Sequence, residues 1–261
     1  ELDLSFDFDL ATATLASART GSASSALSQL KLSTRTTPAW RYGAFLTNHD
    51  QDRVMSVLGQ DVEKARRAAA MLLTGPGTPF IYYGEEIGMT GRGSHEAVRT
   101  PMQWCSESTA CFTTGLPWAA LQPDAAEHNV AAQAQDPDSL LSFYRALIQL
   151  RSQYPALQTG QPFGVTANPS GVYALLRAAP DQTLLVLLNL GPEPVEGFEL
   201  SLREGPLRGE YQVSLVEAPS TSLGMQAPHL QANSQGGFDA YRPFPELPAG
   251  AVVVLQLDPQ P

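Results

Sequence analysis

Residues 43–53 read Gly-Ala-Phe-Leu-Thr-Asn-His-Asp-Gln-Asp-Arg, and this stretch decides the fold class. Its apolar part, taken from residue 42 to residue 47, is typical of a buried strand. The strand ends abruptly in Asn48, His49 and Asp50, so hydrogen-bonding and titratable side chains stand where it stops. In parallel α/β proteins, catalytic groups lie at the carboxyl ends of the strands. The stretch therefore predicts one strand of a parallel sheet with a candidate site at its end.

The chain on either side of this strand alternates strand and helix patterns. Residues 2–8 alternate apolar and polar side chains, which predicts a strand. A helix is expected from about residue 10 to residue 30, with an interruption near Gly21. A second helix, capped by Asp61, follows the strand of residues 42–47. Residues 78–84 are expected to form a third buried strand.

A long loop rich in Gly and Pro then extends to about residue 137. Asp138 and Ser139 open a further helix, which stops near Tyr154. Its apolar residues recur at helical spacing and are expected to share one face. They are Leu140, Leu141, Tyr144, Leu147 and Ile148.

After about residue 160 the pattern changes to strands without helices between them. Residues 172–177, 183–189 and 251–257 are apolar runs separated by Gly, Pro and Asn turns. This pattern predicts an antiparallel sheet, folded as a small sandwich. We therefore expect two domains, residues 1–158 and residues 159–261.

The order of elements in residues 1–158 is that of the end of a (β/α)8 barrel. The predicted fold class is α/β: the C-terminal part of a TIM barrel, about strands 6–8, followed by an all-β antiparallel sandwich. Three strands cannot close a barrel, and a parallel sheet must be covered on both faces. The sheet then has an open edge that needs a partner. We expect the preceding strands to belong before Glu1 or to another chain, so that this chain is a fragment.

Composition excludes several classes of function. The 261 residues carry a formal net charge of −10, which argues against nucleic acid and anionic lipid as partners. No apolar run approaches the roughly 20 residues that span a bilayer. Residues 1–3 lack a signal-peptide pattern, but in a fragment this leaves the compartment open. Cys105 and Cys111 are compatible with a disulfide or with two free thiols, and no second ligand pair completes a zinc site.

Three motifs carry a resemblance to a known family. Residues 45–50, Phe-Leu-Thr-Asn-His-Asp, resemble the end of the seventh barrel strand of the α-amylase superfamily, glycoside hydrolase family thirteen. Residues 76–88 resemble its eighth strand. Residues 99–104, Arg-Thr-Pro-Met-Gln-Trp, followed by Gly-Leu-Pro-Trp at 115–118, are similar to a loop of its α-glucosidase and oligosaccharide-acting members. The resemblance covers nearly the whole chain, since the last hundred residues resemble the usual C-terminal β domain.

The resemblance implies a retaining mechanism on α-glucosidic bonds. The family uses an Asp nucleophile after strand four, a Glu acid/base after strand five and a transition-state-stabilising Asp after strand seven. Asp50 matches the last of these, and nothing in the chain matches the other two. Asp7 and Asp9, which follow the predicted sixth strand, are not substitutes. No cofactor is expected, and the chain has no calcium loop of the Asp-x-Asp-x-Asp-Gly type. Calcium in related enzymes is held by segments that would precede Glu1.

The resemblance and the chemistry give each candidate residue a role. Asp50 would stabilise the positive charge of an oxocarbenium-like transition state. His49 would donate to sugar hydroxyls, while Asn48 would brace the turn rather than contact sugar. Arg99 would lie at the pocket floor, where relatives pair it with an Asp from an early barrel loop; here sugar contact and a structural salt bridge both stay open. Arg53 would reach the aglycone side, or else lie solvated on the surface.

Neighbouring polar residues are given structural readings. Glu85 and Glu86 are adjacent, so their side chains point apart and cannot easily share one pocket. Tyr82 and Tyr83 are expected in the core with their hydroxyls paired.

Three hypotheses follow. In the first, the intact protein is a retaining hydrolase of α-1,4 or α-1,6 glucans or oligosaccharides, and this chain alone is inactive because it lacks two catalytic groups. Its partners would be the sugar substrate and the N-terminal barrel half. In the second, it is a non-catalytic carbohydrate-binding or assembly module. In the third, the enzyme is a transglycosylase or isomerase of the trehalose-forming type, which product analysis would distinguish.

Overall fold

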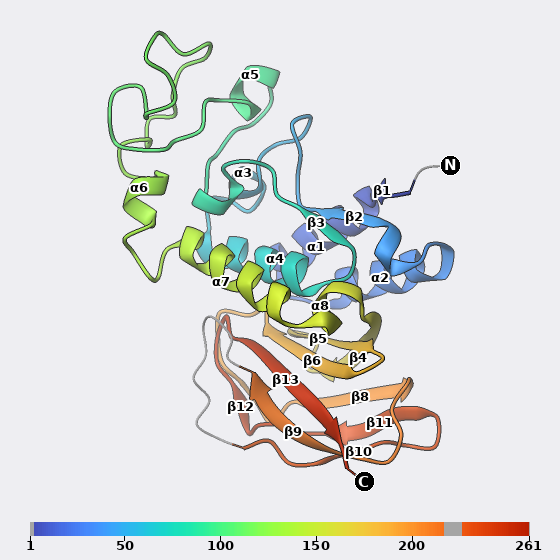
Figure 1. Ribbon diagram of the computed structural model, residues 1–261. Helices are drawn as coiled ribbons and strands as arrows, with labels where there is room; N and C mark the ends of the chain where they lie inside the picture. The colour runs from blue at the N-terminus through green and yellow to red at the C-terminus, as the bar shows by residue number, and fades with distance from the viewer. Residues whose placement is uncertain (1–2, 217–225, 261) are drawn as a thin grey trace.

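The N-terminal part of the computed structural model, which describes residues 3–216 and 226–260, is built on a small parallel sheet. Its three strands are β1 (Ser5–Phe6), β2 (Tyr42–Phe45) and β3 (Thr78–Phe80), in the order β1-β2-β3. The register pairs Phe6 with Gly43 and Phe45 with Phe80. The strand that carries the candidate site is therefore the middle one, as Figure 1 shows.

Helices cover this sheet. Between the first two strands lie α1 (Phe8–Thr20), α2 (Ser24–Thr36) and a short 3-10 helix, η1 (Ala39–Arg41). The predicted interruption near Gly21 is confirmed: Gly21 ends α1 in the left-handed conformation, at φ +74°. Helix α4 (Val62–Thr74) begins where predicted, since Asp61 Oδ1 accepts a hydrogen bond from the Lys64 amide at 3.1 Å.

The first strand is shorter than the alternation of residues 2–8 predicted. Only Ser5–Phe6 pairs as a strand among the described residues of this stretch. Asp7 is the cause, because its Oδ1 accepts a hydrogen bond from the Leu10 amide at 2.9 Å and thereby caps α1. The capping interaction turns the chain into a helix before the alternating pattern is complete.

The third strand also differs from the prediction of a buried strand over residues 78–84. Strand β3 has three residues, and Phe80 is 42% exposed. Beyond Phe80 the chain turns at Gly84, with φ +85°, into a 3-10 helix, η2 (Glu85–Ile87). Phe80 is exposed because β3 is an edge of the sheet, and no strand in the described part of the chain pairs with its outer side.

Both edges of the sheet are open in the part of the chain that the structure describes. Phe6, Phe8 and Phe80 are each about half exposed, although they belong to one aromatic cluster with Phe45. The ring centroids of Phe6 lie 5.3 Å from Phe45 and 4.9 Å from Phe80, both edge-to-face. Exposed aromatic clusters and unpaired strand edges are typical of surfaces that another segment or chain covers.

The long loop projects from one end of the molecule (Figure 1). It contains only short helices, α5 (His95–Val98) and α6 (Val130–Gln133). A further short helix, α3 (Val54–Val57), lies earlier in the chain, between β2 and α4. Helix α7 (Leu140–Gln153) begins as predicted, because Ser139 accepts a hydrogen bond from the Ser142 amide. Four of its five predicted core residues are buried, but Ile148 is 45% exposed. A five-residue helix, α8 (Pro155–Thr159), follows.

The rest of the chain is an antiparallel β domain. Its main sheet has the order β10-β9-β13-β6-β5-β4-β8-β11, and β7 pairs with β12. The strands are β4 (Gln161–Asn168), β5 (Val172–Ala179), β6 (Gln182–Asn189), β7 (Val195–Glu196), β8 (Glu199–Glu204), β9 (Glu210–Val216), β10 (Leu230–Gln231), β11 (Gly236–Tyr241), β12 (Glu246–Leu247) and β13 (Val252–Pro259).

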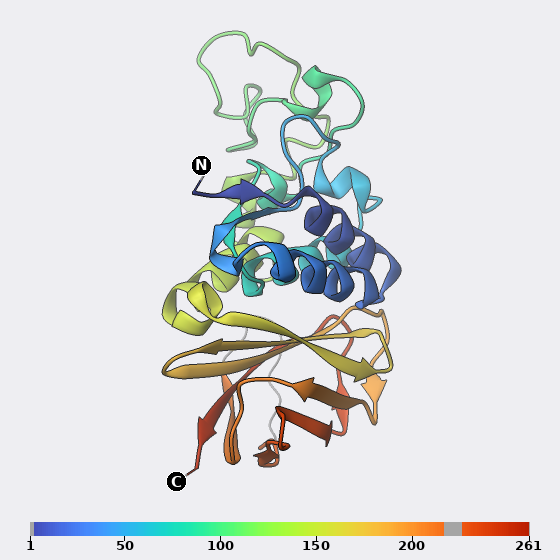
Figure 2. The ribbon, with the colours of Figure 1, turned by 90° about the vertical axis from the view of Figure 1, so that its right-hand side faces the viewer.

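Strand β4 makes this sheet into two layers. Its first five residues pair with β5, whereas its last three pair with β8. The sheet therefore bends at β4, and a hydrophobic core fills the space inside the bend. Figure 2 shows the layer of β4 and β5 against the helices and the strands of the other layer beneath it. No helix in the described part of the chain is long and apolar enough to cross a membrane.

Two buried arginines, one from α7 and one from the β domain, bind the chain at the C-terminal end of α4. Arg151 of α7 donates to the carbonyl oxygens of Leu73, Gly75 and Gly77, at 2.6–2.9 Å. Arg177 of β5 donates to the carbonyl oxygen of Thr74 at 2.7 Å. Both guanidinium groups thus satisfy the carbonyls at the C-terminal end of α4, where the helix dipole favours positive charge. Burial lowers the pKa of Arg177 to about 9 and that of Arg151 to about 10.

Candidate active site

The turn after β2 holds the candidate residues in a fixed conformation. Phe45, Leu46 and Thr47 are buried, and the chain emerges at Asn48. The Asn48 Oδ1 atom accepts a hydrogen bond from the Asp50 amide at 2.9 Å, which is an Asx turn. Asn48 therefore braces the turn, as its sequence position suggested, and presents the side chain of Asp50 to solvent.

Asp50, His49 and Arg99 form one exposed cluster. Arg99 Nη2 lies 2.8 Å from Asp50 Oδ1, and Arg99 Nε donates to the His49 carbonyl oxygen at 3.0 Å. His49 Nε2 lies 3.2 Å from Asp50 Oδ2. Both carboxylate oxygens of Asp50 are thus engaged. The three side chains are open to water, so their ion pairs contribute little to the stability of the fold. Their main effect is to orient the side chains relative to one another.

Arg99 forms a salt bridge with Asp50, which is one of the two possibilities given for it, and sugar contact stays a prediction. Arg99 is therefore not unpaired in the absence of an early barrel loop, because it pairs with Asp50. The long loop that carries Arg99 is held against the turn after β2 by this contact. The sequence predicted that Arg99 lies near the site, but it did not indicate which carboxylate pairs with Arg99.

Arg53 lies elsewhere than expected. It is 1% exposed, so it is not a solvated surface arginine, and direct contact with a sugar does not fit this burial. Its Nη1 atom donates to the Tyr83 carbonyl oxygen at 2.6 Å, and its guanidinium lies 4.7 and 4.6 Å from the ring centroids of Tyr82 and Tyr83. Its amide donates to the Gly91 carbonyl oxygen at 3.0 Å. Arg53 therefore connects the turn after β2 to the segment after β3.

The two tyrosines continue this connection to the long loop. Tyr82 Oη donates to the Val98 carbonyl oxygen at 3.0 Å, and Tyr83 Oη donates to the Thr100 carbonyl oxygen at 2.8 Å. Their hydroxyls are paired as predicted, but neither is a core residue, because Tyr82 is half-buried and Tyr83 is 38% exposed. The tyrosines bind the backbone of the two residues on either side of Arg99 and so fix the position of the Arg99 backbone.

Glu85 is a buried acid beneath the turn that follows β3. It is 2% exposed, and its Oε1 atom accepts a hydrogen bond from Tyr144 Oη at 3.1 Å. Burial raises the pKa of Glu85 to about 8, while burial also raises the pKa of the neighbouring Glu86. The Arg53 guanidinium acts in the opposite direction on both. Glu85 contacts α7 and not the exposed cluster, in agreement with its structural reading.

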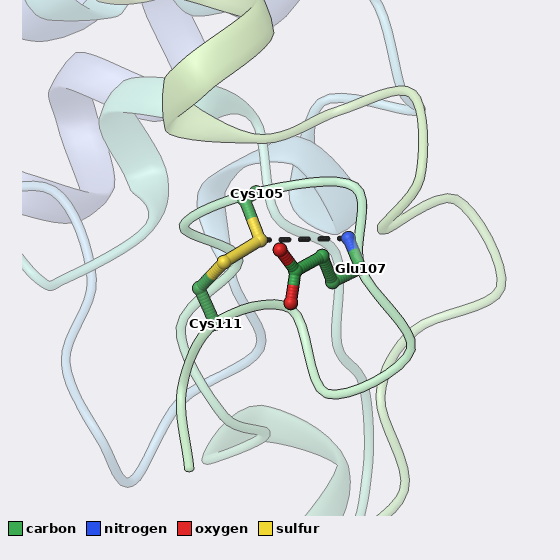
Figure 3. A group of neighbouring side chains, drawn as sticks. All are labelled: Cys105, Glu107 and Cys111. Atoms are coloured by element: carbon green, nitrogen blue, oxygen red, sulfur yellow. Dashed lines mark hydrogen bonds between the residues drawn. A yellow bond between two sulfur atoms is a disulfide. The ribbon is translucent and has the colours of Figure 1, made fainter. Parts of the chain in front are cut away.

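The cysteines are joined. Cys105 and Cys111 form a disulfide in the long loop, and the Glu107 amide donates to Cys105 Sγ at 3.4 Å, as Figure 3 shows. These three residues are the one group of possible metal ligands that lie close together among the described residues. Since both sulfurs are in the disulfide, the group offers no thiolate to a metal.

The chain matches known proteins, in sequence over more than half of its length and in structure over nearly all of it. A family model for "Alpha amylase, catalytic domain" matches residues 1–160. The oligo-1,6-glucosidase of Parageobacillus thermoglucosidasius is 33% identical over 186 residues, which are 56% of this chain and 33% of that protein. The crystal structure of an α-amylase from H. orenii has a TM-score of 0.75 at 30% identity, covering 98% of this chain and 49% of that one.

A third similar protein is named for a synthase reaction and not for hydrolysis. The trehalulose synthase MutB from Pseudomonas mesoacidophila MX-45 has a TM-score of 0.67 at 26% identity, covering 91% of this chain and 47% of that one. The chain spans about a third of the length of the curated relative and about half of each solved structure.

Proposed function

This chain belongs to the α-amylase catalytic-domain family of glycoside hydrolases, and we propose that it is the C-terminal part of a retaining enzyme that cleaves α-glucosidic bonds. The observation that carries the proposal is the placement of Asp50, on a braced turn at the carboxyl end of the middle strand, with His49 and Arg99 around it. In this assignment residues 1–158 are the last part of the barrel, and residues 159–261 are a separate β domain.

Asp50 is the carboxylate that stabilises the transition state. A fixed anion next to the anomeric carbon offsets the positive charge that develops as the glycosidic bond breaks. His49, whose imidazole is exposed beside Asp50, donates to a hydroxyl of the same glucose unit. Asn48 positions the turn and makes no sugar contact. The nucleophile and the acid/base come from barrel strands that precede this chain.

Arg99 changes partner when the barrel is complete. In this chain it holds Asp50 Oδ1, so a sugar hydroxyl must compete with a guanidinium for that oxygen. The family pattern gives this arginine a carboxylate from an early barrel loop. Arg99 then lines the floor of the pocket, and Asp50 is free to face the substrate. Arg53 acts on the same site through Tyr83, as a positioning residue.

The preceding barrel half is the partner of the open sheet. The barrel half can pair its strands with the two unpaired edges, β1 and β3. It can also bury the exposed aromatic rings of Phe6, Phe8 and Phe80. Burial of such surface contributes roughly 25 cal/mol per Å². The pairing would also bring the two missing catalytic groups to the same end of the barrel as Asp50.

The substrates that fit best are short α-1,4- or α-1,6-linked glucosides, cleaved from an end. The name of the P. thermoglucosidasius relative supports the oligosaccharide choice. The trehalulose synthase favours a second candidate, in which the same groups transfer glucose to another sugar and water is not the acceptor. A non-catalytic sugar-binding module is a third possibility, which the test below also addresses.

The stereochemistry of the first product tests the proposal. The protein with a complete barrel should release α-glucose first from maltotriose or isomaltotriose, because two successive inversions retain the configuration. Proton NMR in the first minutes of the reaction separates α- from β-glucose before mutarotation mixes them. Release of β-glucose first, or cleavage of cellotriose at a similar rate, would contradict the proposal. A new glucoside in place of free glucose would support the transferase, and no reaction would support the binding module.

A further inference from the structure

The group of possible metal ligands in the long loop contains none of the candidate residues of the active site. Cys105, Glu107 and Cys111 each offer one ligand atom, and these three atoms all lie within 4.8 Å of one another. Figure 3 shows the Glu107 carboxylate beside the two sulfur atoms. Glu107 and Cys111 are exposed and Cys105 is half-buried, so solutes can reach the group. The sequence indicated only the two cysteines, and the structure adds the carboxylate.

Backbone hydrogen bonds hold this loop in shape in addition to the disulfide. The Trp104 and Cys105 amides both donate to the Ala110 carbonyl oxygen, at 3.0 and 3.3 Å. The Ala110 amide donates to the Glu107 carbonyl oxygen at 2.8 Å, and Ala110 is fully buried. The Cα atoms of Cys105 and Cys111 lie 5.5 Å apart. We therefore expect the two cysteines to stay close together when the bond between their sulfurs is reduced.

The spacing of the three ligand atoms suits a small tetrahedral ion. With Zn–S bonds of about 2.3 Å and a Zn–O bond of about 2.1 Å, tetrahedral geometry separates the ligand atoms by roughly 3.6–3.8 Å. The Glu107 amide also donates to Cys105 Sγ at 3.4 Å, and hydrogen bonds of this kind orient metal ligands. Two sulfurs and one carboxylate favour zinc over magnesium and calcium, which prefer sites made of oxygen atoms.

Two residues of this loop have an unfavourable backbone conformation. Ala110 and Cys111 lie in the left-handed region, at φ +50° and +54°, where residues other than glycine are uncommon. The disulfide restrains Cys111 in this conformation, so its reduction removes one restraint from the loop. An ion held by the same two sulfurs would restore that restraint.

We propose that Cys105, Glu107 and Cys111 form a zinc site when the disulfide is reduced. A dithiol transfers two electrons and two protons to the disulfide, which becomes two thiols, while the dithiol closes to its own disulfide. Zn²⁺ then displaces the two thiol protons and forms two Zn–S bonds, and the Glu107 carboxylate forms a Zn–O bond. Water takes the fourth position. The oxidised chain has no such site, because neither sulfur is a thiolate.

Titration of the 261-residue chain with zinc chloride tests this site and needs no other barrel strands. The chain is reduced with dithiothreitol, which is then removed under argon because it binds zinc itself. Calorimetry measures the Kd and the number of ions bound, and circular dichroism checks that the reduced chain is folded. We expect one ion per reduced chain, with a Kd roughly 100-fold or more below that of the oxidised chain.

Two matched glutamate variants test the third ligand. Glu107→Gln removes the carboxylate from the group, and Glu127→Gln makes the same change at an exposed glutamate elsewhere in the long loop. In the reduced chain Glu107→Gln should weaken zinc binding by roughly tenfold or more, whereas Glu127→Gln should change the Kd by less than about twofold. The double variant Cys105→Ser with Cys111→Ser should bind zinc as weakly as the oxidised chain.

Cobalt(II) in place of zinc identifies the sulfur ligands, since a thiolate-to-cobalt absorption band appears only when sulfur binds the ion. We expect this band in the reduced chain and not in the cysteine double variant. Equal zinc binding by the oxidised and reduced chains, or no binding by the reduced chain, would overturn the proposal. Loss of the fold on reduction would also overturn it, because the site requires the folded loop. Unchanged binding by Glu107→Gln would refute the three-residue site.

Discussion

Changing Asp50 to Asn in the protein with a complete barrel is expected to lower kcat by about 10²- to 10³-fold. The amide keeps the shape of the side chain but loses the negative charge that offsets the developing positive charge of the sugar. KM should change much less, since the lost interaction is strongest in the transition state. Steady-state kinetics on a nitrophenyl α-glucoside measures both constants.

Asp52 provides the matched control, two residues further along the same turn. Its Oδ1 atom accepts a hydrogen bond from the Gly93 amide at 2.8 Å, and its Oδ2 atom pairs with Arg92. Both carboxylate oxygens of Asp52 are used in holding the loop, so Asp52 does not act at the anomeric carbon. The Asp52→Asn variant should therefore keep most of the activity. Near-normal rates for Asp50→Asn, or an equal loss for Asp52→Asn, would refute the role given to Asp50.

Replacing Glu85 with Gln is expected to make the chain more stable at pH 8, by about 1–3 kcal/mol, and to have little effect near pH 4.5. Burial raises the pKa of Glu85 from its usual 4.5 to about 8. Between these values the unfolded chain loses a proton that the folded chain keeps. The contribution of Glu85 to stability is therefore full below pH 4.5, falls as the pH rises, and is lost above about pH 8. Gln does not titrate and can still accept the hydrogen bond from Tyr144.

Urea unfolding at pH 5, 6.5 and 8 checks this prediction. The charged and titratable groups near Glu85 are Arg53, Glu86 and Tyr144, and the variant leaves all three in place. Glu127→Gln is the control, because that side chain is exposed and its change should shift the unfolding curve equally at the three values. A stability difference for Glu85→Gln that does not grow with pH would mean that Glu85 is already ionised in the folded chain.

Local sequence signals predicted the parts of this fold that local interactions determine. Asp61 and Ser139 cap the helices that follow them, and Gly21 ends a helix in the left-handed conformation. Each of these depends on one side chain and its own backbone. The turn at Asn48 belongs to the same class, because its hydrogen bond to the Asp50 amide spans two residues.

The features that the sequence did not determine come from interactions between distant segments. Arg53 and Tyr83 are 30 residues apart, so the burial of the guanidinium could not be read from the motif around it. The pairing of Arg99 with Asp50 spans 49 residues and depends on which carboxylate is within reach. Strand β3 has the composition of a buried strand but lies at an edge, since burial is decided by neighbouring strands and not by the strand itself.

The most direct test of this account is hydrolysis of a nitrophenyl α-glucoside by this chain alone and after addition of a polypeptide with the preceding barrel strands. We predict no turnover by the chain alone, and turnover once native mass spectrometry shows the two polypeptides assembled. Asp50 would then act together with a nucleophile and an acid/base from the added half. Turnover by the 261-residue chain alone, or an assembled complex without turnover, would contradict the claim that this chain supplies one of three catalytic carboxyl groups.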